Sequence, residues 1–474
     1  MALQGFPLGR LHGALGGCVR VGHIIGRVPE GDTGAAWLPR RVWDLHVPLW
    51  IAHRGMANVY PENTLEAFRG TLACGVDLVE PDCWLTRDGG LVCMHDGSVD
   101  RTTDGSGASD QLTVAGVRAL RVDAGRWFAA AWPNTLRVPT LGDVLDEVGG
   151  RAGLCPEAKN AGAGRAIVEL LTQHDLLDTA LVQSFMRAEL GPAVAAGCEA
   201  MMLTATSSYD PVGLRASGIR YLALSAALPP GLVAPARTAG VEVIVWVVDR
   251  RVDAAPWLSA GAVGFFSNDP LYLSGRSPVL AADPFGRRSF YHGHLASSIA
   301  GDRGRFYAAN AWGYPDTSPR YQGALQGWAS PIHEDPAADR FEITFTVRID
   351  AVSADNGWAG AFIAAADDRS FDDIDRYEPG LCGYHVVLRR SGELEVHIVD
   401  DGITRAVSSA ATPAIEAGDT ARLHISVTPT QVTATRLDAP ALATVAVTDA
   451  RHRGGYFHLG RRAAAAVFSE ITIS

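Results

Sequence analysis

The sequence predicts a (β/α)8 barrel followed by an all-β sandwich. From residue 49 to about residue 274, short apolar runs alternate with segments of helical periodicity, which is the spacing of repeated βα units around a parallel sheet. Over residues 341–474, apolar and polar residues instead alternate with period two in short segments bounded by turn residues, which is typical of a sandwich. A chain of 474 residues is long enough for two or three domains.

The composition excludes several classes of protein. The chain carries 41 basic and 52 acidic residues, a net charge of −11, so we expect no nucleic-acid partner. Hydrophobic residues make up 47% of the chain, yet no apolar run approaches the ~18 residues of a membrane span. We therefore expect a globular protein without a membrane span, and the sequence leaves its oligomeric state open.

We expect the first 48 residues to form an N-terminal arm, because they are rich in Gly and Arg and lack clear periodicity. They contain no apolar core and no small-residue cleavage site, so we expect no signal peptide. A virion location, such as a phage tail, and a cytoplasmic one both fit this expectation. The seven cysteines have no metal-type spacing, and we expect most of them to be small buried residues with free thiols.

The barrel region contains one strand more than the eight that a barrel needs. Strands are expected at residues 49–53, 76–83, 91–95, 153–158, 180–184, 200–203, 220–224, 241–247 and 262–266, and helices at 63–73, 141–148, 164–173, 186–196, 211–217 and 232–239. The stretch from Asp82 to His95 is too short for a parallel crossover but fits a hairpin in which Thr86 pairs with Leu91 and Asp82 lies opposite His95. The surplus strand therefore belongs to an insertion after the second barrel strand, about residues 87–139, which we expect to cover the pocket.

The C-terminal region divides at about residue 341. Residues 275–340 have no regular period and form a linker or the start of the sandwich. Sandwich strands are expected at residues 341–349, 358–365, 384–390, 394–399, 421–428, 431–437, 442–448, 455–460 and 466–473. The acidic run at 367–378 lacks the Gly spacing of an EF-hand loop, so a solvated loop explains it better.

Two pairs of ionisable residues lie at i, i+2 near the ends of neighbouring barrel strands. Residues with this spacing share one face of a strand, so Glu80 points the same way as Asp82, and Glu157 the same way as Lys159. Three converging carboxylates repel each other unless a cation lies among them, and hard oxygen ligands favour Ca²⁺ or Mg²⁺. Lys159 is the only lysine among the 41 basic residues, which indicates a pocket that accepts a compact charge but not a guanidinium.

His53 and His95 are the candidate proton-transfer pair. Each ends an apolar strand at the same predicted rim, and imidazole titrates near neutrality. Arg54 and Lys159 place positive charge where a phosphoryl group would develop negative charge. Together with the carboxylates, these residues predict a phosphoryl-transfer site.

A series of short motifs between residues 49 and 272 resembles the glycerophosphodiester phosphodiesterase family. The motifs are His53-Arg54-Gly55, Pro61-Glu62-Asn63-Thr64, Glu80-Pro81-Asp82, Thr86-Arg87-Asp88-Gly89, His95-Asp96, Arg101-Thr102-Thr103, Glu157-x-Lys159, Ser184-Phe185 and Trp246. The resemblance implies a TIM barrel with an insertion after strand 2, which agrees with the strand count.

The resemblance also implies roles for individual residues. It implies that one divalent metal ion is bound by Glu80, Asp82 and Glu157, and that the acid and base are His53 and His95. It also implies that the phosphate is held by Arg54 and Lys159 and that Trp246 lines the glycerol side. Glu62 and Asn63 would shape the rim by hydrogen bonds.

Two departures from the family pattern lie near the end of the barrel. Trp246 is followed by Val247-Val248-Asp249 where the family often has a small polar residue and Asn, and residues 267–270 read Ser-Asn-Asp-Pro where Thr-Asp-x-Pro is usual. We expect both departures to affect the substrate side and the choice of alcohol, and not hydrolysis itself.

The sequence favours metal-dependent hydrolysis of a glycerophosphodiester to a glycerol phosphate and an alcohol. The attacking group is water or the substrate's own hydroxyl, and the sequence does not choose between them. The sandwich is similar to concanavalin-like or laminin-G-like jelly-roll domains, which often bind glycans, although a structural or oligomerising role is equally compatible. Two alternatives follow: a phage-tail or wall-directed hydrolase of teichoic acid (polyglycerophosphate), and a glycan- or wall-binding protein with an inactive barrel.

Overall fold

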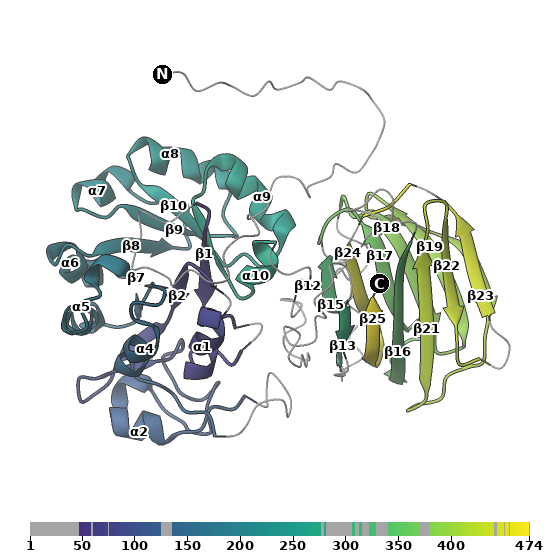
Figure 1. Cartoon of the computed structure of the whole chain (residues 1–474), viewed down its shortest axis with the longest axis horizontal. Helices are drawn as coiled ribbons and strands as arrows, with labels where there is room; N and C mark the ends of the chain where they lie inside the picture. The colour runs from purple at the N-terminus through teal and green to yellow at the C-terminus, as the bar shows by residue number, and fades with distance from the viewer. Residues whose placement is uncertain are drawn as a thin grey trace.

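The structure is a computed structural model with two domains, a barrel and a sandwich, as predicted (Figure 1). It describes residues 47–57, 60–73, 75–124, 135–275, 279–280, 306–308, 312–314, 322–328, 340–369, 379–439, 443–449, 451–454 and 456–473. The predicted N-terminal arm up to residue 46, residues 127–132 of the predicted insertion and most of the acidic run at 367–378 lie outside these residues.

Parallel strands close the barrel in a ring within the described residues. In order they are β1 (Leu49–His53), β2 (Leu78–Glu80) continued by β3 (Asp82–Leu85), β5 (Gly153–Leu154) continued by β6 (Glu157–Ala158), β7 (Leu181–Ser184), β8 (Glu199–Thr204), β9 (Tyr221–Ser225), β10 (Glu242–Trp246) and β11 (Gly264–Ser267). The last strand, β11, pairs with β1 and completes the ring.

Prolines interrupt the second and third barrel strands without breaking their pairing. Pro81 separates β2 from β3, and Pro156 lies between β5 and β6, because proline has no N–H to give to a ladder. Pairing continues across both breaks, since Cys155 N donates to Val79 O at 2.8 Å and Glu157 N donates to Pro81 O at 2.9 Å. The predicted strands at 76–83 and 153–158 are therefore each one barrel strand in two pieces.

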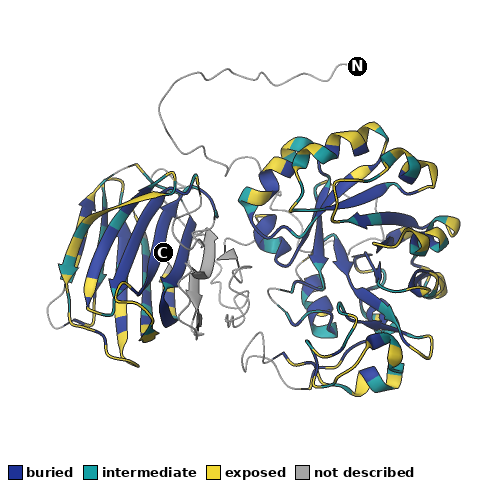
Figure 2. Ribbon diagram, turned by 180° about the vertical axis from the view of Figure 1, so that it is seen from behind, coloured by how far each residue is buried: buried dark blue, intermediate teal, exposed yellow. Residues whose placement is uncertain are grey.

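Helices surround the ring, and all of those named here except α10 have exposed residues on their outer faces (Figure 2). They are α1 (Leu65–Ala73), α4 (Leu141–Val148), α5 (Ala163–Gln173), α6 (Arg187–Ala195), α7 (Pro211–Ala216), α8 (Val233–Thr238), α9 (Arg251–Ala260) and α10 (Pro270–Leu273). Strand residues that point inward, such as Ile51 and Phe266, form one apolar cluster, whereas Val79 and Cys83 pack outward with the helices. The outward direction of Val79 and Cys83 leaves Glu80 and Asp82 facing inward, as the i, i+2 pattern predicts.

The insertion begins with a hairpin whose predicted register was wrong by one residue. Strand β4 (Leu91–Cys93) pairs Leu91 with Leu85, because Thr86 N donates to Gly90 O at 2.8 Å and closes a three-residue loop. Asp82 therefore lies opposite Met94, whose N–H donates to Asp82 O at 2.9 Å. His95 follows one residue later, beyond the paired segment.

The rest of the insertion forms a small unit of its own. Helix α2 (Val114–Ala119) packs with the hairpin through an apolar cluster that includes Val92, Val99 and Val117. The insertion has its own core, so it can place side chains at the barrel rim without belonging to the barrel sheet.

The sandwich consists of two antiparallel sheets. One sheet contains β12 (Val279–Leu280), β15 (Gln322–Trp328), β24 (Tyr456–Arg462), β17 (Trp358–Ala365), β18 (Gly383–Arg389), β19 (Glu393–Asp400) and β20 (Ile403–Ala411). The other contains β13 (Phe306–Ala308), β25 (Ala464–Ile473), β16 (Phe341–Val352), β21 (Thr420–Val427), β22 (Gln431–Arg436) and β23 (Ala443–Thr448), with β14 (Trp312–Tyr314) also paired to β25.

The alternation that predicted the sandwich corresponds to its buried face. Ile343, Phe345 and Val347 are fully buried at every second position of β16. Strand β20 was not predicted, because it lies at a sheet edge and is exposed along most of its length, so it has no apolar face to detect.

Four of the cysteines, Cys83, Cys93, Cys155 and Cys198, are buried free thiols, as predicted for most of them, whereas Cys382 is disulfide-bonded. Within the ranges given above, no helix combines the length and the apolar character needed to cross a bilayer.

Candidate active site

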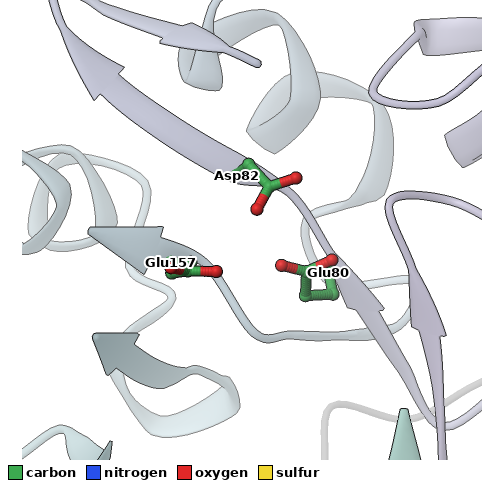
Figure 3. Close-up of side chains that lie close together, drawn as sticks. All are labelled: Glu80, Asp82 and Glu157. Carbon is green, nitrogen blue, oxygen red and sulfur yellow. The ribbon is translucent and has the colours of Figure 1, made fainter. Parts of the chain in front are cut away.

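Three buried carboxylates meet at the carboxyl end of the barrel strands. Glu80 ends β2, Asp82 begins β3 and Glu157 begins β6, and one oxygen from each lies within 4.8 Å of the others (Figure 3). The strand pairing explains this meeting, because Asp82 is the direct neighbour of Glu157 across the β3–β6 ladder. The sequence therefore predicted the cluster correctly from two separate motifs.

The three charges strongly affect one another. Burial, together with Asp82 and Glu157, raises the pKa of Glu80 well above its usual range. Burial also raises the pKa of Glu157 to about 7. Burial acts in the same direction on Asp82, but Lys159 and Arg54 outweigh it and lower the pKa of this carboxyl. The cluster thus contains more negative charge than its surroundings neutralise.

The cluster fits a hard divalent cation. All of its donors are carboxylate oxygens, which suit Mg²⁺ or Ca²⁺ better than softer metals. Gln183 on β7 donates Nε2 to Glu80 Oε1 at 3.2 Å, and its own Oε1 is buried beside the cluster without a hydrogen bond. The raised pKa of Glu80 and this buried oxygen without a hydrogen bond both fit a cation bound among the carboxylates.

Two cations lie against the carboxylates. The Lys159 ammonium contacts Asp82 Oδ1 and Glu157 Oε2, each at 2.9 Å, and its side chain is only 10% exposed. Arg54 places Nε 3.5 Å from Asp82 Oδ2 and donates its backbone N–H to Glu80 Oε2 at 2.7 Å. The single lysine of the chain therefore lies buried against the carboxylates, as its i, i+2 spacing from Glu157 predicted.

His53 is held by a chain of hydrogen bonds that the sequence did not reveal. Its Nδ1 lies 2.7 Å from Asn268 Oδ1, and Asn268 Nδ2 donates to Asp249 Oδ2 at 2.8 Å. A carboxylate only accepts, so Asn268 must turn its NH2 toward Asp249 and its oxygen toward His53. His53 Nδ1 is therefore the donor, and Nε2 is left with a lone pair.

This geometry adds a second role for the two departures from the family pattern, whose effect on the choice of alcohol stays a prediction. Asp249 and Asn268 form the support of His53. Asp249 also accepts from the backbone N–H of Asn268 at 2.7 Å and from Ser267 Oγ at 3.0 Å. Both departures therefore belong to one hydrogen-bonded unit, which a reading of separate motifs could not show.

His95 has a different support. Its Nδ1 lies 2.7 Å from Asp96 Oδ1, and Arg101 donates to both oxygens of Asp96. Arg101 also donates to both oxygens of Glu62, at 2.9 and 2.7 Å, and Glu62 in turn contacts Arg54 Nη1 at 3.2 Å. Arg101 belongs to the Arg101-Thr102-Thr103 motif, but its role could not be seen from the motif alone.

Asn63 fixes the position of Asp82. Its Nδ2 donates to Asp82 Oδ2 at 2.7 Å, and its Oδ1 accepts from Asp82 N at 3.1 Å. Asn63 and Glu62 thus form hydrogen bonds at the rim, as the resemblance implied.

Trp246 ends β10 at the same rim. Its Nε1 donates to Ala223 O at 3.1 Å, and its ring meets Phe185 edge-on with 5.4 Å between centroids. Phe185 is 46% exposed, so the two rings form an apolar surface that solvent can reach. No contact joins Trp246 to the carboxylates among the described residues.

The fold and the site together define a class of protein: a barrel enzyme with two histidines and a buried carboxylate cluster at one rim. A model of the glycerophosphoryl diester phosphodiesterase family matches residues 53–162. A glycerophosphodiester phosphodiesterase from Caldanaerobacter subterraneus is 30% identical over 232 residues, which are 47% of this chain and 94% of the relative. A putative glycerophosphodiester phosphodiesterase from Bacillus subtilis is 29% identical over 234 residues, 47% of this chain and 95% of the relative.

A solved phosphodiesterase structure from Oleispira antarctica, in complex with the product sn-glycerol-3-phosphate, is 25% identical, with a TM-score of 0.45 over 49% of this chain and 98% of that chain. Because the Caldanaerobacter relative is 30% identical over 94% of its own length, the chain belongs to the glycerophosphodiester phosphodiesterase family.

Proposed function

We propose that this chain hydrolyses glycerophosphodiesters to a glycerol phosphate and an alcohol, and that one divalent cation, Mg²⁺ or Ca²⁺, takes part. The observation that carries the proposal is the meeting of two separately supported imidazoles and three buried carboxylates at one rim of the barrel. Glu80, Asp82 and Glu157 hold the cation, and Asn63 and Gln183 hold two of these ligands in place. When bound, such a cation offsets negative charge on the phosphoryl oxygens.

The supports of the two histidines favour different roles for them. His53 accepts the proton of the attacking hydroxyl at Nε2, because its Nδ1 already donates to Asn268. His95 gives a proton to the leaving alcohol oxygen, and the Asp96 carboxylate stabilises the imidazolium that this role requires. Arg54 and Lys159 contact the phosphate oxygens, and Trp246 with Phe185 lines the side of the glycerol or alcohol.

Turnover with and without a chelator tests the role of the cation. We expect EDTA to lower hydrolysis of glycerophosphocholine by at least about 100-fold, with activity restored by adding Mg²⁺ or Ca²⁺. Glu157→Gln should cause a loss of similar size that added cation does not restore. Glu199→Gln is the matched control, because Glu199 is a buried carboxylate paired with Arg220 at the opposite end of the barrel. Undiminished activity in EDTA would contradict the role of the cation.

The substrate alternatives are separated in the same assay. Release of glycerol phosphate from purified polyglycerophosphate, with slower turnover of small diesters, would favour a teichoic-acid hydrolase. A folded chain that binds glycans through the sandwich but turns over neither substrate would favour the binding-protein alternative.

A further inference from the structure

Helix α9 begins directly after the rim loop, defined here as residues 246–250, and its own sequence provides no cap. The residue at its N-cap position is Arg250, whose side chain makes no capping hydrogen bond. The first N–H groups of a helix have no partner within the helix, so they need an acceptor from elsewhere. In a helix that packs against a second domain, water cannot always supply it.

The sandwich supplies this acceptor. Asp368 accepts the backbone N–H of Arg251 at Oδ2, 2.6 Å away, and that of Val252 at Oδ1, 2.9 Å away. Its backbone oxygen accepts from Arg250 Nη1 at 2.8 Å. Asp368 is completely buried, and its negative charge lies at the positive end of the helix dipole. This carboxylate thus performs the task of an N-cap residue from another domain.

The contact is fixed from a second side by α10. Tyr272 donates its hydroxyl to Asp368 Oδ2 at 2.8 Å, and its ring is fully buried in an apolar cluster with Trp358 and Phe362 of the sandwich. The Arg251 guanidinium lies over the same ring, 4.3 Å from its centroid, and donates Nε to Tyr272 O at 2.8 Å. Asp368 therefore has one defined position between the two domains.

The capped helix start adjoins the support of His53. Asp249 directly precedes Arg250 and holds Asn268, whose Oδ1 accepts from His53. Trp246 begins the same loop. A displacement of the first turn of α9 would therefore move both the apolar surface of the rim and the base of the hydrogen-bond chain that orients His53.

We propose that Asp368 is a positioning residue for the barrel's active site, and that the sandwich is part of the catalytic unit through this contact. Asp368 touches no substrate atom in this assignment. It holds the rim loop by capping α9, and the loop holds Trp246 and Asp249. The kinetic consequence rests on the proposed hydrolysis, whereas the structural contact can be tested without it.

Hydrogen exchange tests the contact directly in the full-length protein. In Asp368→Ala, amides in peptides covering residues 246–255 should exchange about fivefold faster or more, because an N-cap contributes roughly 1 kcal/mol to its helix. Helix α4 should not change, since its Thr140–Asp143 capping box is local. Asp367→Ala is the matched control, because the neighbouring Asp367 pairs with Arg369 and makes none of the contacts to α9.

Kinetics test the positioning role. We expect kcat/KM to fall about tenfold in Asp368→Ala, less in Asp368→Asn and not in Asp367→Ala, because small displacements of positioning groups are costly. The Mg²⁺ or Ca²⁺ concentration for half-maximal activity should stay unchanged, since the contact does not touch the carboxylate cluster. Should Asp368→Ala fail to fold, Tyr272→Phe removes one hydrogen bond to Asp368 and should give the same changes to a smaller extent.

Each outcome decides a different part. Unchanged exchange at residues 246–255 would refute the contact. Faster exchange with unchanged kcat/KM in Asp368→Ala would refute the positioning role. That role would also be refuted if the Mg²⁺ or Ca²⁺ concentration for half-maximal activity rose by the same factor by which kcat/KM fell. Absence of turnover in the wild-type protein would instead refute the proposed function, while the exchange measurement would still decide whether Asp368 caps α9.

Discussion

His53 and His95 lie at the same rim but in different surroundings. His53 belongs to a barrel strand, and its partner is a neutral amide held by a carboxylate. His95 belongs to the insertion, its side chain is 36% exposed, and its partner is a carboxylate held by an arginine. Burial and Arg54 lower the pKa of His53 to about 3, and burial also lowers the pKa of His95. The two histidines thus differ in their neighbours and not in their position on the rim, and this difference underlies the proposed roles of base and acid.

The largest expected effect separates the two tasks by leaving group. His53→Ala should lower kcat by about 1,000-fold for both an alkyl diester and a nitrophenyl diester, because both need the base. His95→Ala should cause a similar loss for the alkyl diester but less than about 10-fold for the nitrophenyl diester, whose leaving group needs no proton. Steady-state kinetics with both substrates measure this. If both variants lost activity equally with the two leaving groups, or both mainly with the alkyl diester, the assignment of His53 as base and His95 as acid would be contradicted.

A smaller effect is expected at the support of His53. Asn268→Leu removes the acceptor of Nδ1 and should lower kcat by about 10- to 100-fold, the range seen for partners that orient a histidine. Asn268→Asp keeps an acceptor but adds a charge that stabilises the imidazolium, so it raises the pKa of the base. Activity should then be lost at a higher pH as the solution is acidified, and the pH profile of kcat/KM measures this shift. An unchanged acidic limb would mean that Asn268 does not control His53.

The last expected effect is on stability and not on turnover, and it concerns Glu62, which joins the two sides through Arg54 and Arg101. Burial opposes its ionisation, but Arg54 and Arg101 outweigh burial and lower its pKa from 4.5 to about 2. A lowered carboxyl pKa stabilises the folded state above pH 4.5. This contribution, on the order of 3 kcal/mol, is lost as the pH falls toward 2.

The free energy of unfolding of Glu62→Gln should therefore lie below that of the wild type at pH 7, and the two should converge below pH 4.5. Denaturant unfolding at several pH values measures this difference. Glu147→Gln is the control, because its partners Arg69 and Arg151 are more than half exposed and such surface pairs contribute little. A constant difference at all pH values would show that Glu62 acts through packing and not through its charge.

Much of the barrel and the cluster could be predicted because their signals are local. Residues at i, i+2 on a strand share a face whatever surrounds them, so Glu80 and Asp82 could be paired from sequence alone. The hairpin register failed by one residue, because the sequence Arg87-Asp88-Gly89-Gly90 is compatible with a three-residue loop and with a four-residue loop and does not choose between them. The exposed strand β20 gave no signal, since it buries no apolar face.

The support of His53 and the start of α9 could not be predicted, because their partners are distant in sequence. His53 meets Asn268 at a separation of 215 residues, and α9 meets Asp368 at a separation of 117. Helix α9 also contains Pro256 and no local cap, so the usual signs of a helix are missing from its sequence. Motifs identify residue types at a site, but the hydrogen bonds that orient them depend on the closed fold.

The position of Asp368 in the chain has a consequence for synthesis on the ribosome. Arg251 leaves the ribosome 117 residues before the carboxylate that accepts its N–H. At ordinary rates of translation this interval is on the order of 10 s. Until the first strands of the sandwich have been made, helix α9 therefore lacks this cap, and Tyr272 lacks the sandwich side chains that pack on it. A chain that ends at residue 274 would lack both contacts permanently.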